Sequence, residues 1–460
     1  MELTQAVCER ARLARDARFD GRFFIAVTST GIYCRPICPA TPKSSNVLYF
    51  PSAAAAAEAG FRPCLRCRPE TSPGTPAWLG TSVSVSRGLK LIAEGALDEG
   101  SVDQLAARLG LGSRHLRRMF LQHLGATPVA VAQTRRVHFA KKLIDETDLP
   151  MTQVAMASGF GSIRRFNDTF QKLYGRTPGD LRRATARERR GDEAGVYTFR
   201  LGYRPPYNWA SMIGFLGPRA VPGVETITLD EYRRSILLDG KSGFISVRPV
   251  AAKNLLELRI EFPEPAALFR IVERVRNIFD LRSDPAEVDG HLKKDSRLKR
   301  IVQAHAGMRV PGCWDGFEIG VRAILGQQVS VKGATTMAGR LVTEFGRGNF
   351  PTAESLADAD LARIGLTKAR ANSIRELASA VARGEVSFDA SQGLEAFEEA
   401  MTNLPGIGPW TAQYVAMRIG EPDAFPAGDL YLRSFAKEAE AWRPWRAYAG
   451  MYIWSGSHLL

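Results

Sequence analysis

No run of about 18 apolar residues, the length that a membrane-spanning helix requires, occurs in this sequence. The first residues, Met1–Asp20, have the pattern of a charged amphipathic helix and lack the apolar core of a signal peptide. Cysteine is also scarce, with 6 in 460 residues, which excludes the disulfide scaffold of a small secreted protein. We therefore expect a cytoplasmic protein that has no membrane among its partners.

The composition is otherwise that of a folded protein. Hydrophobic residues make up 45% of the chain and aromatic residues 9%, which excludes a disordered protein. A chain of 460 residues holds about three or four domains. The 62 Lys and Arg outnumber the 48 Asp and Glu and give a formal net charge of +14 at pH 7. Such a charge favours a polyanion as partner, although it is also compatible with an ordinary basic protein.

Four of the cysteines form two close pairs, Cys34-x3-Cys38 and Cys64-x2-Cys67. Two such pairs supply the four thiolates of a tetrahedral Zn²⁺ site, and the prolines between and after them stiffen the turns. We predict one zinc ion, bound in a small domain of residues 1–75. The spacing alone leaves open whether this zinc has only a structural role. The other cysteines, Cys8 and Cys313, have no partner at a metal-binding spacing.

The residues around these cysteines, Gly31–Cys38 and Gly60–Glu70, resemble the N-terminal domain of Ada-type adaptive-response proteins. The resemblance implies that Cys34 is both a zinc ligand and a methyl acceptor, which takes one methyl group from a methylphosphotriester in DNA. Zinc keeps the sulfur as thiolate, the form that attacks carbon. Methylation removes one negative charge near the DNA backbone, so the alkylated protein should bind DNA more tightly.

Residues 82–186 contain an internal repeat of about 50 residues, in which Val102–Ala106 matches Met151–Ala155 and Leu109–Ser113 matches Ser158–Ser162. Short helix–Gly–helix units of this length predict an all-α domain with two helix-turn-helix modules. Ser113 and Ser162 are expected to cap the second helix of each module.

These second helices are rich in residues suited to DNA, and the repeat resembles the AraC-type DNA-binding domain. A solvated basic face on an ordinary helical domain is the alternative reading. The Pro-Cys-His-Arg motif of the methyltransferase domain that follows in many Ada-type proteins is absent. The residues expected on this DNA-binding face are Arg114, His115, Arg117, Arg118, Arg164, Arg165 and Asn167.

Between the domains, Thr71–Gly80 and Arg182–Gly195 have the composition of linkers. Residues 195–265 then show short β-rich runs separated by turn residues, which predict an antiparallel sheet subdomain. Residues 266–460 are helical in pattern, with stops at Gly346–Pro351 and Gly365. The whole chain is thus expected to be a multidomain α+β protein.

Within the helical part, Leu404–Gly408 predicts a tight hairpin between two helices, in which Gly406 and Gly408 expose backbone N–H groups to a DNA phosphate. A carboxylate follows at Asp429, after a Phe-Pro-Ala-Gly segment. A hairpin followed by such an aspartate resembles the helix–hairpin–helix superfamily of base-excision glycosylases, and this resemblance implies a catalytic role for Asp429. Asp429 taken alone is also compatible with a helix N-cap.

Longer segments extend the resemblance to AlkA-type 3-methyladenine DNA glycosylase II: Tyr203–Trp209, Gly214–Ala220, Val321–Val331 and Trp442–Tyr448. It implies an aromatic pocket for a cationic base extruded from the duplex. The residues at the pocket positions are Trp410, Tyr414, Trp454 and Phe215, each of which is also compatible with the hydrophobic core.

Three positions refine this expectation. Superfamily members that also cut the strand have a lysine directly after the hairpin, and here Trp410 stands there, which predicts a monofunctional enzyme. The apolar wedge that fills the gap left by the base is replaced by polar Gln328, and Val329 could share that role. The segment between Asp429 and Trp442 is shorter than in the family, which could tilt the helix expected to carry the catalytic carboxylate.

Together these segments predict an alkylation-response protein in which a methylphosphotriester sensor and transcription activator is fused to a glycosylase that removes 3-methyladenine and 7-methylguanine. The alternatives are a pure regulator with an inactive glycosylase fold, and a glycosylase whose zinc is only structural. The expected partners are double-stranded DNA, at damaged sites and promoter operators, and RNA polymerase. We expect a monomer associated with the nucleoid, and the superfamily also implies a monovalent cation at the hairpin.

Overall fold

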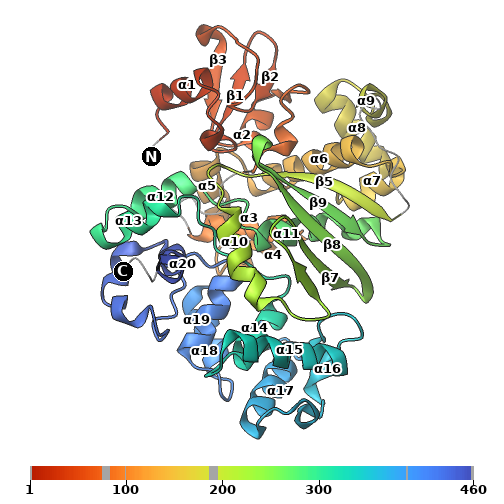
Figure 1. Ribbon diagram of the computed structural model, residues 1–460. Coiled ribbons are helices and arrows are strands. Elements are labelled where there is room, and N and C mark those ends of the chain that lie inside the picture. Colours follow the sequence, from red (N-terminus) through yellow and green to blue (C-terminus); the bar gives the residue numbers. More distant parts are fainter. Residues whose placement is uncertain (1–2, 75–82, 99, 186–194, 390–391, 457–460) are drawn as a thin grey trace. The chain divides into compact units, whose positions relative to one another are not determined.

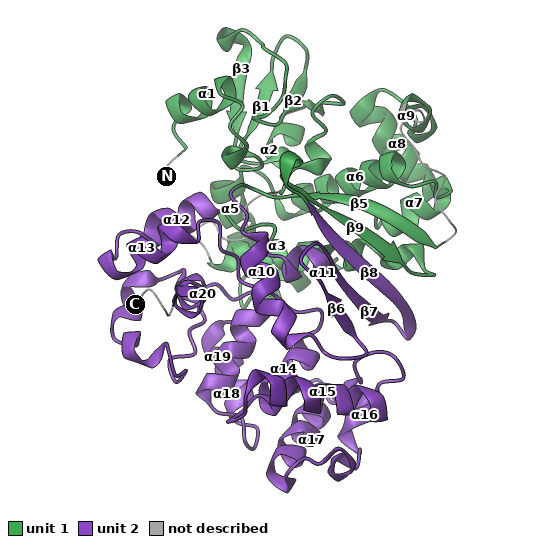
Figure 2. Cartoon of the chain, viewed as in Figure 1, with its two compact units in different colours: residues 1–205, 250–273, 281–284 green, residues 206–249, 274–280, 285–460 purple. Residues whose placement is uncertain are grey.

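The computed structural model describes residues 3–74, 83–98, 100–185, 195–389 and 392–456. The chain folds into two compact units, one of residues 1–205, 250–273 and 281–284, and one of residues 206–249, 274–280 and 285–460 (Figure 2). Both contain helices and strands, and the predicted multidomain α+β class is confirmed. None of the described helices is both long and apolar enough to cross a bilayer. Most of the predicted linkers, at 75–80 and 186–194, lies outside the described residues.

The first unit begins with a small four-stranded sheet in the order β3-β1-β2-β4 (Figure 1). β1 pairs antiparallel with both β2 and β3, and β4 runs parallel to β2. Apolar side chains such as Phe23 and Ile25 pack together with the cysteines in one core. The elements of this segment are α1 (Gln5–Leu13), η1 (Ala17–Phe19), β1 (Phe24–Val27), β2 (Ile32–Cys34), η2 (Ser44–Asn46), β3 (Val47–Phe50), α2 (Ala53–Glu58), β4 (Arg62–Pro63) and η3 (Pro69–Thr71).

The repeated segment forms the two predicted helix-turn-helix modules. Four residues, 109–112, join α4 to α5, whereas five residues, 158–162, join α7 to α8. The extra residue of the second copy therefore lies in the turn. The helices are α3 (Val83–Ala93), α4 (Val102–Arg108), α5 (Ser113–Leu124), α6 (Pro128–Glu146), α7 (Met151–Ala157), α8 (Ile163–Tyr174) and α9 (Pro178–Thr185).

The shorter turn also corrects one predicted cap. Ser162 caps α8 as expected, and its hydroxyl accepts a hydrogen bond of 3.2 Å from the N–H of Arg165. The prediction that Ser113 caps α5 is wrong, because Gly112 is the cap residue and Ser113 is already the first helical residue. Without the extra turn residue, the helix of the first module begins at the serine rather than after it.

The first unit also contains the antiparallel pair of β5 (Val196–Gly202) and β9 (Leu255–Glu261). The ring of Phe139 in α6 lies 6.4 Å from the ring of Phe199 in β5. Lys142 donates a hydrogen bond of 2.6 Å from its Nζ to the carbonyl of Arg200. The helix that joins the two modules therefore packs against this pair of strands. η6 (Ala251–Lys253) and η7 (Pro265–Ala267) complete the unit.

The second unit contains an antiparallel meander and a set of helices. Its strands are β6 (Glu225–Ile227), β7 (Tyr232–Leu238) and β8 (Lys241–Val250). α15 ends before Gly346, and Gly365 ends η8 with φ +82, so the predicted stops are confirmed. The boundary between the units passes through α11 (Leu268–Ile278).

The helical elements of the second unit are α10 (Trp209–Leu216), η5 (Gly217–Arg219), α12 (Pro285–Leu292), α13 (Ser296–Ala304), α14 (Gly316–Leu325), α15 (Val331–Phe345), α16 (Ala353–Ala357), η8 (Leu361–Ile364), α17 (Lys368–Ala382), α18 (Leu394–Thr402), α19 (Pro409–Arg418), η9 (Arg433–Phe435), η10 (Glu438–Trp442) and α20 (Arg446–Gly456).

Candidate functional site

The two cysteine pairs meet at one point of the first unit. The N–H of Cys64 donates to the carbonyl of Tyr33 over 3.0 Å, which places the second pair beside the end of β2. The sulfur atoms of Cys34, Cys38, Cys64 and Cys67 all lie within 4.8 Å of one another. A tetrahedral zinc ion with Zn–S bonds of about 2.3 Å separates its sulfurs by about 3.8 Å, so the cluster has the donor set and the size that zinc requires.

Polar contacts surround this cluster. The backbone N–H of Arg35 donates to the Sγ of Cys67 over 3.4 Å, and the Arg35 guanidinium forms an ion pair with Asp20. Hydrogen bonding with the other thiols, above all that of Cys34, lowers the pKa of Cys64. Cys34, Cys38 and Cys67 are buried, whereas Cys64 is partly exposed. Cys34 therefore exposes little of its surface to another molecule.

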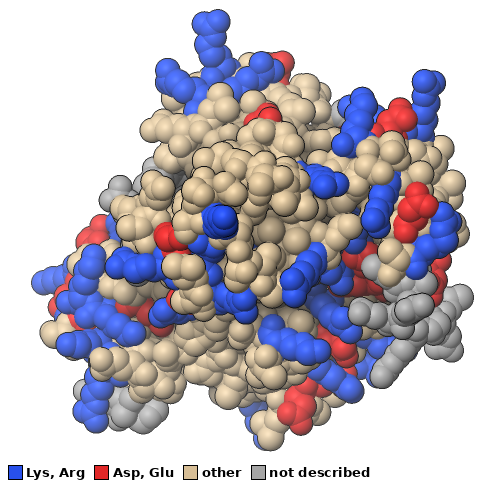
Figure 3. Space-filling view, turned by 90° about the horizontal axis from the view of Figure 1, so that it is seen from above, with Lys and Arg blue, Asp and Glu red and all other residues tan. Residues whose placement is uncertain are grey.

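The second helices of both modules present their polar residues to solvent. Leu116 and Phe120 of α5, and Phe166 and Phe170 of α8, are fully buried and hold each helix on its module. The opposite faces leave the predicted DNA-binding residues exposed, with Arg118 and His115 in contact at 2.8 Å. Lys and Arg side chains are also more numerous than Asp and Glu on the face shown in Figure 3. The exposed residues in the two helices are Arg114, His115, Arg117, Arg118, Arg164, Arg165 and Asn167.

The predicted hairpin lies between α18 and α19 of the second unit. Gly406 has a φ of +77, and a Cβ there would overlap the Oγ of Ser373 in α17, so only glycine fits. Gly408 caps α19 without a side-chain hydrogen bond, and a Cβ there would meet open space. The first turn of α19 therefore keeps backbone N–H groups available for an anion. Gln327 fixes the hairpin by donating from Nε2 to the carbonyl of Gly406 over 2.9 Å.

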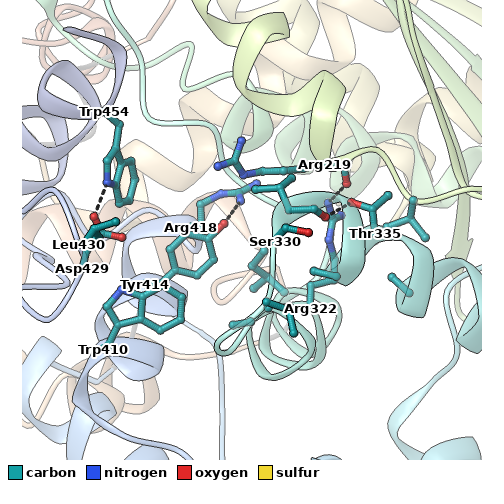
Figure 4. A pocket seen from close by; sticks show the side chains of 18 of the residues that line it. Arg219, Arg322, Ser330, Thr335, Trp410, Tyr414, Arg418, Asp429, Leu430 and Trp454 are labelled. Atoms are coloured by element: carbon teal, nitrogen blue, oxygen red, sulfur yellow. Dashed lines mark hydrogen bonds between the residues drawn. The ribbon is translucent and has the colours of Figure 1, made fainter. Parts of the chain in front are cut away.

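A pocket of about 600 Å³ opens beside this hairpin (Figure 4). Three of the predicted pocket residues, Trp410, Tyr414 and Trp454, line it, as does Asp429. The rings of Trp410 and Tyr414 stack with their centroids 5.4 Å apart and their planes at 8°, and Tyr414 lies 6.5 Å from Trp454. Phe215 is not among the lining residues, but its ring stacks on Trp454 at 6.2 Å.

Asp429 is held at the pocket wall by two hydrogen bonds to the same oxygen. Its Oδ1 accepts from Trp454 Nε1 over 3.0 Å and from the N–H of Tyr431 over 2.9 Å. No α-helix begins at Asp429: the described chain continues through a turn into η9 and η10. The expectation that a helix carries this carboxylate is therefore wrong, because the short segment that follows it forms only turns and the two 3₁₀ elements.

The wedge position lies at the turn between α14 and α15. Gln328 is exposed and has a φ of +54, in the left-handed region. Val329 beside it lines the pocket and is 38% exposed, so an apolar side chain does stand at the rim. Leu430 and Tyr431, which are 65% and 53% exposed, line the pocket directly after Asp429. The sequence analysis did not single out these two residues, because their exposure beside the pocket is visible only in the structure.

Three arginines at the pocket wall were also missed by the sequence reasoning: Arg219, Arg322 and Arg418. Only Arg418 could have been found, because it stands four residues after Tyr414 on one helix face and donates to its hydroxyl over 2.9 Å. Burial acts to raise the pKa of Tyr414, but the guanidinium groups of Arg418, Arg219 and Arg322 outweigh it, and the pKa lies below its usual value. The pocket wall therefore contains three guanidinium groups, of which that of Arg322 is paired with Glu225 and Glu318.

Family models match almost the whole chain in four consecutive segments. The metal binding domain of Ada matches residues 7–70, and a helix-turn-helix domain matches residues 105–184. The AlkA N-terminal domain matches residues 198–315, and the HhH-GPD superfamily of base excision DNA repair proteins matches residues 321–451. The cysteine cluster lies in the first match, and Asp429 with the hairpin lies in the last.

Curated relatives match the chain as a whole and in its halves. The "Probable bifunctional transcriptional activator/DNA repair enzyme AlkA" of Mycobacterium tuberculosis is 40% identical, over 97% of this chain and 95% of the relative. DNA-3-methyladenine glycosylase 2 of Escherichia coli is 34% identical, over 56% of this chain and 96% of its own length. The "Bifunctional transcriptional activator/DNA repair enzyme AdaA" of Bacillus subtilis is 33% identical, over 39% of this chain and 83% of its own length.

Proposed function

The chain belongs to the family of bifunctional AlkA-type transcriptional activators and DNA repair enzymes, and on this basis we propose that it excises alkylated bases from DNA and regulates transcription in response to alkylation. The observation that carries the first activity is the position of Asp429, fixed by Trp454 at the wall of an aromatic pocket. The domain ranges and the site residues given above are part of this proposal.

Base release needs little acid catalysis in this pocket. 3-Methyladenine and 7-methylguanine are cationic in the nucleotide, so they leave with the electron pair of the C–N bond without prior protonation. The carboxylate of Asp429 stabilises the positive charge that develops on the sugar and orients the attacking water. Trp410, Tyr414 and Trp454 offer π faces to the base.

The DNA backbone is proposed to bind at the hairpin. The N-terminus of α19 donates N–H groups to a phosphate, and Gly406 and Gly408 allow that close approach. Gln328, with Val329 at the pocket rim, is proposed to fill the space that the extruded base leaves in the duplex. A monovalent cation is a further part of the proposal: residues Leu404–Gly408 would hold it, and its charge would attract a phosphate of the DNA.

Single-turnover release of 3-methyladenine and 7-methylguanine from duplex DNA tests the enzyme. We expect Asp429→Asn to slow release by about 100-fold or more, because charge stabilisation at the reacting sugar is lost. Asp358→Asn removes an exposed carboxylate of the same unit, outside the pocket, and serves as the control. The products are also expected to be abasic sites that break only after alkali, since Trp410 has no amine for a Schiff base. Equal rates for the wild type and Asp429→Asn would refute the enzyme.

A pure damage-sensing regulator remains the second candidate. The hydrogen bond from the N–H of Tyr431 to Asp429 Oδ1 favours it, because an aspartate that closes a local turn in this way has a structural role. In that case, the wild type would bind alkylated DNA without releasing the base.

For the sensor, Cys34 is the proposed methyl acceptor. Zinc, when bound by the four cysteines, keeps their sulfurs as thiolates. The Cys34 sulfur attacks the methyl carbon of a methylphosphotriester, the C–O bond breaks, and the phosphodiester leaves with the electron pair. The thioether that forms is not reversed, so each chain reacts once. The cluster then has one negative charge fewer, which reduces its repulsion of DNA.

Mass spectrometry after exposure to methylphosphotriester DNA tests this step. One added methyl group on Cys34 is expected in the wild type and in Cys8→Ala, which removes a buried cysteine outside the cluster. No methyl group is expected in Cys34→Ser. A wild type that stays unmodified, although it contains zinc, would show that the zinc is only structural.

Operator binding is proposed for the exposed faces of α5 and α8. Replacing Arg117 or Arg165 by Ala should weaken promoter binding and reduce the slope of log affinity against log salt by about 0.9 for each lost phosphate contact. RNA polymerase as a partner, a monomeric state and association with the nucleoid complete the proposal, and the excess of positive charge supports the last.

A further inference from the structure

The pocket has two chemically different ends. Asp429 and Trp454 lie on one side of Tyr414, whereas Arg219 and Arg322 lie on the other (Figure 4). The carboxylate has to face the sugar, where the C–N bond breaks. The six-membered ring of an extruded purine, which is the part farthest from the sugar, then points toward the arginine end. The side chains at the arginine end therefore face the edge of the purine that carries the C6 substituent.

Two of the three arginines, Arg322 and Arg418, each donate three hydrogen bonds to the protein. Arg322 donates from Nη1 to Glu318 over 2.9 Å and to Glu225 over 3.2 Å, and from Nη2 to the carbonyl of Arg219 over 2.6 Å. Arg418 donates from Nε to Pro311 O, from Nη2 to Gly312 O and from Nη1 to Tyr414 Oη. The guanidinium groups of these two arginines therefore brace the pocket wall.

Arg219 makes fewer hydrogen bonds to the protein than Arg322 and Arg418 do. Its Nη1 donates to the carbonyl of Phe215 over 3.0 Å, and its guanidinium also contacts Tyr414. A guanidinium has five N–H donors, so these two contacts leave donors for a ligand. Among the described residues, no carboxylate pairs with Arg219 or Arg418. The pocket thus contains a half-buried cation with hydrogen-bonding capacity left over.

This cation already uses one of the aromatic faces predicted for the base. The guanidinium carbon of Arg219 lies 3.9 Å from the centre of the Phe215 ring, and that of Arg418 lies 5.1 Å from it. A cationic base beside these groups meets repulsion at this end, and attraction from the rings of Trp410, Tyr414 and Trp454. A C6 carbonyl oxygen, by contrast, accepts from a guanidinium, whereas a C6 amino group has only donors to offer it.

We propose that Arg219 is a specificity-determining residue that donates to the C6 carbonyl oxygen of the extruded purine, so that the pocket favours purines with an acceptor there over those with an amino group. The inference rests on the proposed glycosylase activity. As the C–N bond breaks, the electron pair moves into the base and increases the negative charge on O6. Arg219 stabilises that charge, and its effect is therefore largest for a neutral leaving base such as hypoxanthine, which is not protonated or alkylated beforehand.

Single-turnover rates at saturating enzyme test the proposal with three bases: hypoxanthine and 7-methylguanine, which have O6, and 3-methyladenine, which has an amino group. We expect Arg219→Met to slow release of hypoxanthine by about 10- to 100-fold and of 7-methylguanine by a smaller factor. Release of 3-methyladenine should change by less than about threefold or become faster. Arg219→Lys, which restores a charged donor, should recover part of the hypoxanthine rate.

The controls separate three outcomes. Arg300→Gln, an exposed arginine outside the pocket, should leave all three rates unchanged. If Arg219→Met slows all bases equally, Arg219 only supports the pocket and the inference fails. If it changes none, the inference fails as well. If the wild type and Asp429→Asn release every one of these bases at equal rates, the proposed glycosylase function itself fails. This result differs from the two outcomes for Arg219→Met described above.

Discussion

The indole N–H of Trp454 donates a hydrogen bond of 3.0 Å to Oδ1 of Asp429, and this bond links the last described helix to the carboxylate of the pocket. Without it, the carboxylate is positioned only by the local turn at Tyr431. The ring of Trp454 and its indole N–H thus have separate roles in the proposed reaction: the ring contacts the base, and the N–H orients Asp429.

Replacing Trp454 by Phe removes the donor and keeps an aromatic ring. We expect single-turnover base release to fall by about 10- to 100-fold, since the reacting carboxylate loses a fixed orientation, while affinity for damaged DNA changes little. Trp442→Phe is the matched control, because it also removes an indole donor. The Nε1 of Trp442 donates a hydrogen bond of 2.9 Å to Asp295, and neither residue lines the pocket. A larger loss of activity in the control than in Trp454→Phe would contradict this role.

We expect the stability of the hairpin to require glycine at Gly406 but not at Gly408. In Gly406→Ala, the methyl group meets Ser373 and the backbone keeps a φ of +77. We expect a loss of about 2 kcal/mol or more in the free energy of unfolding, together with weaker DNA binding. Gly408→Ala should unfold like the wild type, because its Cβ meets open space. Denaturant titration of both variants checks the contrast in stability, and DNA-binding isotherms check the weaker binding of Gly406→Ala.

Acid should weaken the first unit through His138. The ring Nε2 of His138 lies 2.8 Å from the hydroxyl of Tyr33, and burial lowers the pKa of His138 to about 4. The unfolded chain binds a proton near pH 6.5 but the folded chain does not, so this stabilising contribution is complete above that pH and is lost as the pH falls toward 4.

The expected loss is about 1–3 kcal/mol across this window. His138→Gln should remove that part of the pH dependence, as measured by denaturant unfolding between pH 7 and pH 4.5. Loss of zinc in acid affects both proteins, and it therefore cancels in the difference between them. A wild type and a variant with parallel curves would disprove the assignment.

Zinc binding should depend on the cysteines of the cluster and not on the cysteines outside it. We expect one zinc per chain in the wild type and in Cys313→Ala, and little in Cys38→Ser, as measured by atomic emission after gel filtration. A chelator should lower the midpoint of thermal unfolding of the wild type, since the site cannot exist in the unfolded chain. A midpoint that stays constant although the metal is removed would show that the small sheet folds without it.

Local patterns predicted much of this fold. The turn residues and alternating strands placed β5 to β9, and the repeat placed both helix-turn-helix modules, because these features depend on neighbours in the sequence. The cap of α5 was misassigned, since one residue of turn length decides it. Arg219 was not found, because its place at the pocket is set by packing across the second unit. The helix expected at Asp429 depended on a length taken from relatives, and this chain is shorter there.

The unequal turns of the two modules, 109–112 and 158–162, have a consequence for how the chain reads DNA. If both modules bind the operator as proposed, two modules of different turn length and different side chains have no internal symmetry in the site that they recognise. A palindromic site would then leave one module mismatched, so an asymmetric site is expected. A protein bound to such a site would have one orientation along the duplex, and that orientation would determine which of two neighbouring genes is expressed.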